Sequence, residues 1–139
     1  MIQKFFNLEV NTSGQRLYEI TDKTVEWIEK NNFNNGMLNV SIQHTSASLI
    51  VQENADPDVQ KDLLNYFDKL VPMNEKLYIH SSEGKDDMPA HIKSALTNNQ
   101  ISLSIKDSKL ILGTWQGIYL FEHRLNNHKR TIVHHYIGN

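Results

Sequence analysis

The 139-residue chain contains no cysteine. This absence excludes disulfides, thiolate zinc sites and cysteine nucleophiles, and it suits a reducing compartment, so we expect a cytoplasmic protein. The chain also lacks any run of about eighteen apolar residues, so we expect no membrane-spanning helix. Residues 1–6 turn polar too soon for a signal peptide.

The chain also lacks a large excess of either charge, because its formal net charge is only -2. A chain with this balance has no electrostatic basis for binding nucleic acid. The length of 139 residues is too short for a (β/α)₈ barrel, which needs roughly 200. Repeats, low-complexity tracts and linkers are absent. With 39% hydrophobic and 22% charged residues, we predict one compact domain over residues 1–139.

Alternating apolar residues predict most of the secondary structure as strands. The predicted strands span residues 2–10 (with an end near Gly14), 38–42, 47–51, 76–80, 101–105, 110–112, 117–123 and 130–137. His44 continues the alternation of the second strand, so we expect its side chain to point toward the interior.

Helices are predicted at two or three places. Thr21-Asp22 favours a helix that runs to about residue 32, and Asp56-Pro57 combines the preferred N-cap and first-turn residues. The second helix has apolar residues at helical spacing up to Leu70, and Pro72 follows its end. Pro89 favours a third helix through residue 96. We therefore predict an α+β fold with a mixed or antiparallel sheet and two to three helices.

Polar residues of the kind that bind metals gather in a few segments. The chain has seven histidines, and imidazole is the commonest metal-ligating side chain. His80 and His91 enclose a loop that carries Glu83, Asp86 and Asp87. These carboxylates can orient imidazoles or bind a metal themselves. A long loop with so many cation-binding groups favours a functional role, although no short zinc motif is present.

Simpler interpretations apply to several of these residues. His44 alone is equally consistent with a core histidine whose nitrogens are satisfied, and the Asp86-Asp87 pair is equally consistent with a solvated loop. Trp115 is consistent with packing alone. Helix capping explains Asp56 best and is an alternative for Glu53 and Asp58, while ordinary surface or strand positions are favoured for His128, His134 and His135. The sequence has no nucleophile elbow, Walker loop or dinucleotide fingerprint.

Four segments together resemble the YjbQ-type family, whose members are often called secondary thiamine-phosphate synthases. They are His44-Thr45-Ser46-Ala47-Ser48, Glu53-Asn54-Ala55-Asp56-Pro57, Asp86-Asp87-Met88-Pro89-Ala90-His91 and Gly113-Thr114-Trp115-Gln116-Gly117-Ile118. Glu122-His123-Arg124 and the final strand also resemble the family, so the similarity covers nearly the whole chain in the family's order.

This resemblance implies a YjbQ-like α+β fold, a homotrimer and a histidine site near subunit boundaries. It implies His44, His80 and His91 as metal ligands, with His123 as a fourth candidate. It also implies a weak thiamine-phosphate synthase activity, which joins a pyrimidine diphosphate to a thiazole phosphate. A three-histidine site suits zinc or another transition metal, whereas Glu83 and its neighbouring acids can hold magnesium beside a leaving diphosphate.

Three functions follow as hypotheses. In the synthase-like transferase, the metal or the acidic loop (Glu83, Asp86 and Asp87) stabilises the leaving diphosphate, Arg124 assists, and Trp115 stacks on a substrate ring. In a metal-dependent hydrolase, the metal activates water, and Glu53 or Glu83 acts as general base. In a binding module, the trimer holds a small molecule without turnover. All three predict a small-molecule ligand and no nucleic-acid or membrane partner.

Overall fold

Two antiparallel sheets and three α-helices make up the protein, which we describe from a computed structural model of residues 1–139. The larger sheet has the strand order β1-β8-β3-β5-β6, and the smaller has the order β2-β7-β4. The strands are β1 (Ile2–Ser13), β2 (Arg16–Glu19), β3 (Gly36–Ile42), β4 (Ala47–Glu53), β5 (Gln100–Lys106), β6 (Lys109–Leu110), β7 (Gln116–Glu122) and β8 (Asn127–Gly138). The helices are α1 (Thr21–Lys30), α2 (Pro57–Leu70), α3 (Asp87–Leu96) and the 3₁₀ helix η1 (Glu75–Leu77).

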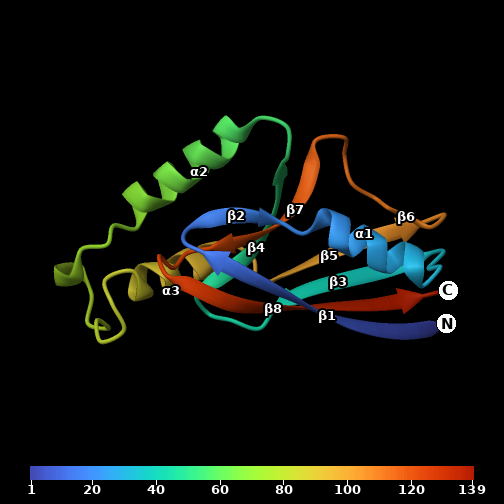
Figure 1. The fold of residues 1–139 in the computed structure, drawn as a ribbon, viewed down its shortest axis with the longest axis horizontal. Helices are drawn as coiled ribbons and strands as arrows, with labels where there is room; N and C mark the ends of the chain where they lie inside the picture. The colour runs from blue at the N-terminus through green and yellow to red at the C-terminus, as the bar shows by residue number, and fades with distance from the viewer.

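Strand β8 organises the larger sheet, because it pairs with β1 over their full length and with β3 on its other side. The two chain ends therefore lie side by side at one edge of the molecule (Figure 1). Gly36 faces Gly138 across this sheet, and a Cβ atom at Gly36 would lie 2.7 Å from the Tyr136 ring. A side chain at Gly36 would thus displace an aromatic ring of the core.

The smaller sheet is buried on both faces. Leu49, Ile118 and Leu120 point into the main core, which also contains side chains of the larger sheet. Tyr119 and Phe121 point the other way and pack against Leu63, Leu64 and Phe67 of α2. This alternation explains why β7 is an almost continuous apolar run rather than an alternating strand.

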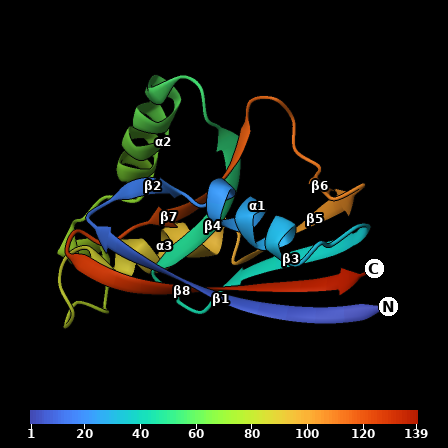
Figure 2. The same ribbon diagram turned by 45° about the vertical axis from the view of Figure 1, so that its right-hand side comes forward.

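Helix α2 forms an outer layer over the smaller sheet. Asp56 caps it by accepting a hydrogen bond from the Asp58 backbone N–H at 2.9 Å, as its sequence predicts. No α2 residue is fully buried, and the helix and the following segment extend from the sheets (Figure 2). In the stretch between α2 and α3, Val71 and Asp86 are buried, and most of the other side chains are exposed.

The predicted α+β class with antiparallel strands is confirmed, and no helix is long and apolar enough to cross a membrane. The predicted strand over residues 76–80 is wrong. Leu77 and Ile79 are exposed and no strand lies beside them, so the segment contains only η1. The sequence does not predict β2, because only Leu17 of its four residues is buried.

Two predicted boundaries also differ from the structure. Helix α3 begins at Asp87, two residues before Pro89; proline is tolerated there because first-turn N–H groups lack intrahelical acceptors. Helix α1 has Ile20 at its N-cap, and the Thr21 hydroxyl hydrogen-bonds to Glu19 instead. His44 follows the end of β3 and is half-buried, so the expected alternation stops at Ile42.

Phe33 tests how strongly the aromatic core stabilises the fold. Its ring is fully buried, stacked on Tyr136 at 3.8 Å and edge-on to Trp27 at 4.9 Å. We expect Phe33→Ala to lower the free energy of unfolding by about 3–5 kcal/mol, measured by urea denaturation. Ile111→Ala, at an exposed loop position, is the control, and we expect it to cost less than about 0.5 kcal/mol. Equal losses of unfolding free energy in both variants would contradict a special stabilising role for the buried Phe33 ring.

Candidate functional site

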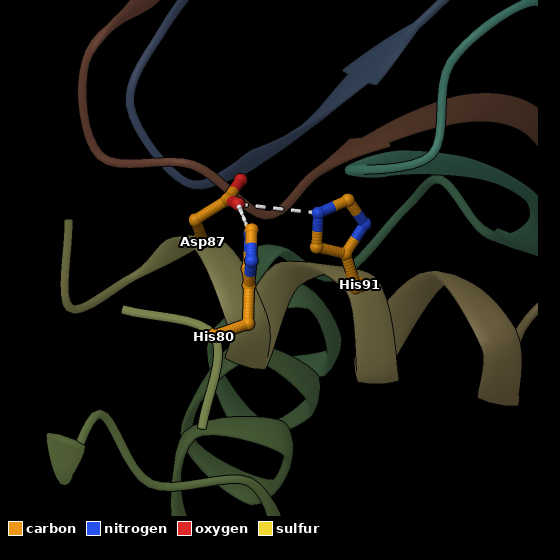
Figure 3. Close-up of side chains that lie close together, drawn as sticks. All are labelled: His80, Asp87 and His91. Carbon is orange, nitrogen blue, oxygen red and sulfur yellow. Dashed lines mark hydrogen bonds and ion pairs between the residues drawn. The ribbon is translucent and has the colours of Figure 1, made fainter. Parts of the chain in front are cut away.

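Two imidazoles converge on one buried carboxylate at the start of α3 (Figure 3). Asp87 Oδ2 lies 2.7 Å from His80 Nε2 and 3.2 Å from His91 Nε2. Asp87 and His91 share a helix face because they are four residues apart, and His80 comes from the preceding loop. The Asp87 side chain is 2% exposed, whereas His80 and His91 are 43% and 31% exposed. The buried Asp87 carboxylate thus anchors the group, and the two imidazoles are open to solvent.

Arg124 holds the other side of the same carboxylate. Its Nη1 donates to Asp87 Oδ1 at 2.7 Å, and its Nε donates to Asp86 Oδ2 at 2.9 Å. Its Nη2 also donates to the Glu83 backbone carbonyl at 2.9 Å. The guanidinium therefore fixes the loop and leaves Asp87 Oδ2 facing the histidines. These contacts make Arg124 a positioning residue, because each of its donor nitrogens is already engaged.

Electrostatics keep this acidic pair ionised. Burial acts to raise the pKa of Asp87, but hydrogen bonds from His80 and Glu83, with the charges of Arg124 and His91, hold that pKa below its usual value. Burial also acts to raise the pKa of Asp86, which the Leu125 backbone N–H and Arg124 together lower. The carboxylates of Asp86 and Asp87 and the guanidinium of Arg124 together carry one net negative charge beside the two imidazoles, which favours a bound cation.

A backbone contact of His91 fixes a proton on one of its two ring nitrogens. Its Nδ1 lies 3.0 Å from the Thr45 carbonyl oxygen, which can only accept, so Nδ1 carries a proton. In the neutral ring Nε2 then has a lone pair, and it faces Asp87 Oδ2 at 3.2 Å. Two lone pairs at this distance repel each other unless a proton or a metal ion lies between them.

The donor set fits a transition metal. The ligand atoms of His80, Asp87 and His91 all lie within 4.8 Å of one another. Around a tetrahedral zinc, ligand atoms at about 2.0–2.1 Å from the metal are roughly 3.4 Å apart, so only small shifts would seat an ion. The Thr45 carbonyl supplies the second hydrogen-bond acceptor that metal-bound imidazoles usually have.

The structure does not bring His44 into this group. Its Nε2 accepts a hydrogen bond from the Thr131 backbone N–H at 2.8 Å. Burial, and next the charge of Arg130, lower its pKa. His44 instead lines a cavity of about 250 Å³ whose wall also includes His91. The structure therefore groups His80, Asp87 and His91, whereas the resemblance implied His44, His80 and His91 as ligands.

The remaining predicted residues are separated from this cluster. The buried His123 pairs with Ser48 through Nε2 at 2.8 Å, and burial lowers its pKa to about 3, so it is a neutral packing residue. Glu53 pairs with Gln116 at the far end of β4 and β7, six residues or roughly 20 Å along the strand from the Ala47–Glu122 pair. Trp115, beside Gln116, is 63% exposed.

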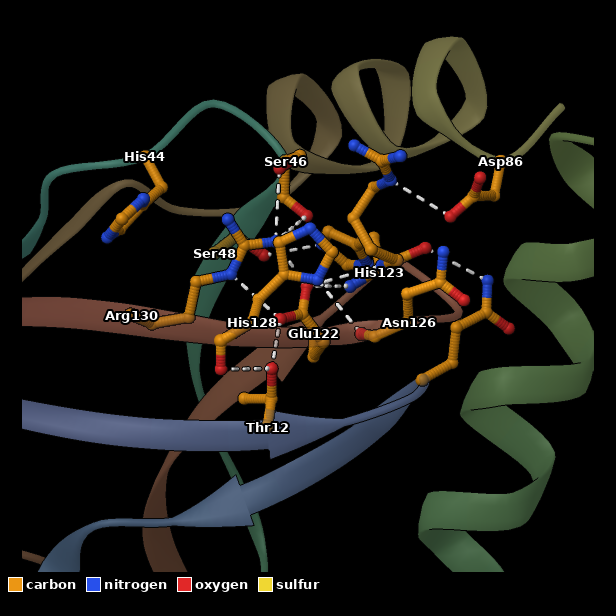
Figure 4. Close-up of polar contacts among 12 residues, drawn as sticks. Thr12, His44, Ser46, Ser48, Asp86, Glu122, His123, Asn126, His128 and Arg130 are labelled. Carbon is orange, nitrogen blue, oxygen red and sulfur yellow. Dashed lines mark hydrogen bonds and ion pairs between the residues drawn. The ribbon is translucent and has the colours of Figure 1, made fainter. Parts of the chain in front are cut away.

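A buried ion pair that the sequence interpretation missed lies between the sheets (Figure 4). Arg130 donates from Nε and Nη2 to the two carboxylate oxygens of Glu122, and Thr12 and Ser46 complete the network. Burial acts to raise the pKa of Glu122, but Arg130 and Thr12 lower it. The position of Glu122 in register with Ile118 and Leu120 is the sequence signal that could have revealed its burial.

Comparisons with known proteins agree on one family. The family description "UPF0047 protein YjbQ-like" matches residues 6–139. A UPF0047 protein of Synechocystis is 46% identical over 94% of this chain and 89% of its own length. The UPF0047 protein YjbQ of Escherichia coli O157:H7 is 39% identical over 94% of each. A conserved hypothetical protein from Thermus thermophilus has a TM-score of 0.82 at 32% identity, covering 92% of this chain and 97% of its own.

Buried neutral histidines make stability depend on pH. Burial lowers the pKa of His134 to about 4, well below its unfolded value near 6.5. Between these values the unfolded chain binds the extra proton, so stability falls as the pH falls. We expect a loss of up to about 1.4 kcal/mol per pH unit for this histidine. His134→Gln, which keeps an N–H for Thr24, should flatten urea-denaturation stability between pH 6 and 5; an unchanged slope would contradict this.

Proposed function

The chain belongs to the YjbQ-like UPF0047 family, and we propose that it is an enzyme that binds a divalent transition metal through His80, Asp87 and His91. We further propose that it hydrolyses a small ester, lactone or phosphoester. The observation that carries the proposal is the convergence of His80 Nε2 and His91 Nε2 on one oxygen of the buried Asp87 carboxylate.

A metal ion would satisfy all three ligand atoms together. It would bond to His91 Nε2 and the Asp87 oxygen at once and also to His80 Nε2, which faces the same carboxylate oxygen. Arg124 would hold the carboxylate in place through its other oxygen, so Asp87 would bind through one oxygen only. Two imidazoles and one carboxylate are a ligand set of catalytic zinc sites and of other transition-metal enzymes.

The open side of the cluster supports catalysis rather than a structural role. Structural zinc sites are closed by four protein ligands, whereas this group offers three and is exposed at both imidazoles. When bound, the metal would lower the pKa of a water molecule and polarise a substrate oxygen. Glu83 is exposed in the loop that carries this cluster, four residues before Asp87, so we assign its carboxylate the general-base role.

Thiamine-phosphate synthesis is the second candidate, because the resemblance implies it and an open metal site can accept diphosphate oxygens. The geometry supports it less. The guanidinium of Arg124 already donates to Asp86 and Asp87, so it is not free for a diphosphate. Trp115 precedes β7, whereas the cluster lies near the other end of that strand. The resemblance also implies a homotrimer, and the exposed Leu77 and Ile79, shortly before His80, are side chains that a neighbouring subunit could cover. A monomer in light scattering would contradict that arrangement.

Metal content tests the site directly. We expect the purified, untagged protein, supplied with zinc, cobalt or nickel, to hold about one ion per chain by elemental analysis. Asp87→Asn and His91→Ala should each weaken binding at least about tenfold, because each removes a ligand. The matched control is His135→Gln, an exposed histidine of β8, which should retain the full metal content. Full occupancy in Asp87→Asn would remove this carboxylate from the site.

Turnover separates the two reactions. We expect the metal-loaded protein to hydrolyse at least one member of a panel of p-nitrophenyl esters, lactones and phosphoesters, with activity lost on chelation and restored by metal. Glu83→Gln should lower kcat by about 10²–10³ and leave the metal content unchanged, as expected for loss of a general base. Formation of thiamine phosphate from both substrate halves, without any hydrolysis, would favour the transferase instead.

A further inference from the structure

A cavity of about 250 Å³ adjoins the proposed metal site. It is lined by His44, Thr45, His91, Ser94, Ala95 and Asn99. His91 belongs to both places, because its Nε2 faces Asp87 while its ring forms part of the cavity wall. A molecule bound in this cavity would therefore lie beside the metal. The volume suits a small polar group rather than a large apolar ligand.

The tautomer of His44 is fixed by the backbone of β8. The Thr131 N–H can only donate, and it points at His44 Nε2 at 2.8 Å, so Nε2 carries a lone pair. The ring is then neutral and its proton is on Nδ1. Since Nε2 is occupied, the nitrogen left to meet a ligand is Nδ1, which can only donate a hydrogen bond in this state. This excludes His44 as a proton acceptor at Nδ1 and as a metal ligand through Nε2.

A second group on the wall also lacks a partner. Ser94 Oγ is buried and has no hydrogen bond, which is costly for a hydroxyl away from water. Asn99 lines the same cavity and adds an amide. The cavity thus presents neutral donors and contains no carboxylate. Such a donor set is suited to an oxygen that is negative or becomes negative during reaction.

We propose that His44 binds an anionic oxygen of the substrate through Nδ1–H, while the metal binds a second oxygen of the same molecule. This inference rests on the proposed function and defines its substrate class: a small molecule with a phosphoryl or carboxyl group. His44 acts as a substrate-binding residue, and Thr131 positions its ring.

Two substitutions separate the nitrogens of His44. In His44→Asn the amide nitrogen lies near the place of Nδ1, so the donor to the cavity is kept and the acceptor for Thr131 is lost. In His44→Gln the amide extends to the place of Nε2, so the acceptor for Thr131 is kept and the cavity donor is lost. A merely structural role would make His44→Gln the better tolerated variant. The proposal predicts the opposite order for ligand binding.

The test is titration of the zinc-loaded proteins with inorganic phosphate and with acetate, followed by calorimetry and by ¹H–¹⁵N spectra. We expect His44→Gln to raise the Kd of the preferred anion about tenfold, as for one lost charge-assisted hydrogen bond. His44→Asn should stay within about threefold of the wild type. The preferred anion identifies a phosphoryl or a carboxyl substrate. Nitrogen spectra of the metal-free protein should show the Nδ1–H tautomer of His44.

Each outcome decides between distinct assignments. Equal affinities in His44→Gln and the wild type, or no binding of either anion, would overturn the donor role. Loss of zinc from both variants would make His44 a ligand and would also overturn it. Failure of the wild type to take up zinc, cobalt or nickel would refute the proposed metal site instead. The anion titration of metal-free protein would then still test His44, with the same order of variants expected.

Discussion

The organising constraint of the site is the buried charge of Asp87. A carboxylate with almost no solvent contact requires hydrogen bonds or ion pairs on both oxygens. Arg124 satisfies Oδ1, and His80 and His91 converge on Oδ2. This one requirement ties the loop before α3 to the segment after β7. It also places the two imidazoles closer together than unlinked exposed side chains would stay.

The fold separates two kinds of charged group. Glu122 and Arg130 lie between the sheets, where both Glu122 oxygens are engaged by Arg130, and they join β7 to β8 with almost no contact to solvent. The group around Asp87 lies where α3, the acidic loop and the turn after β7 meet, and its imidazoles are exposed. The buried pair is closed to a ligand, whereas His80 and His91 can be reached from solvent. Exposure of the two imidazoles therefore distinguishes the proposed metal site from the buried pair.

Periodicity predicts much of this fold, because β1, β3 and α2 carry clear alternating or helical patterns with caps. It fails at residues 76–80, where two apolar side chains alternate without a neighbouring strand, and at β2, which is too short to show a period. Composition and spacing identify the acidic loop and both of its histidines. They do not reveal the place of Asp87 among the ligand atoms, because that depends on which helix face meets Arg124. The tautomers of His44 and His91 depend on backbone groups that no residue type reveals.

The backbone groups of Thr45 and Thr131 link the proposed metal site to the proposed anion site. The Thr45 carbonyl fixes a proton on Nδ1 of His91 and leaves Nε2 free for a metal. Across the shared cavity, the Thr131 N–H occupies Nε2 of His44 and leaves an Nδ1 proton for a ligand. The same residue type would thus serve opposite tasks in the proposed site, with His91 giving an electron pair to a cation and His44 giving a hydrogen bond to an anion. A molecule that offers one oxygen to the metal and another to His44 would bridge the two, and this is why we propose the cavity beside His91 as the substrate site.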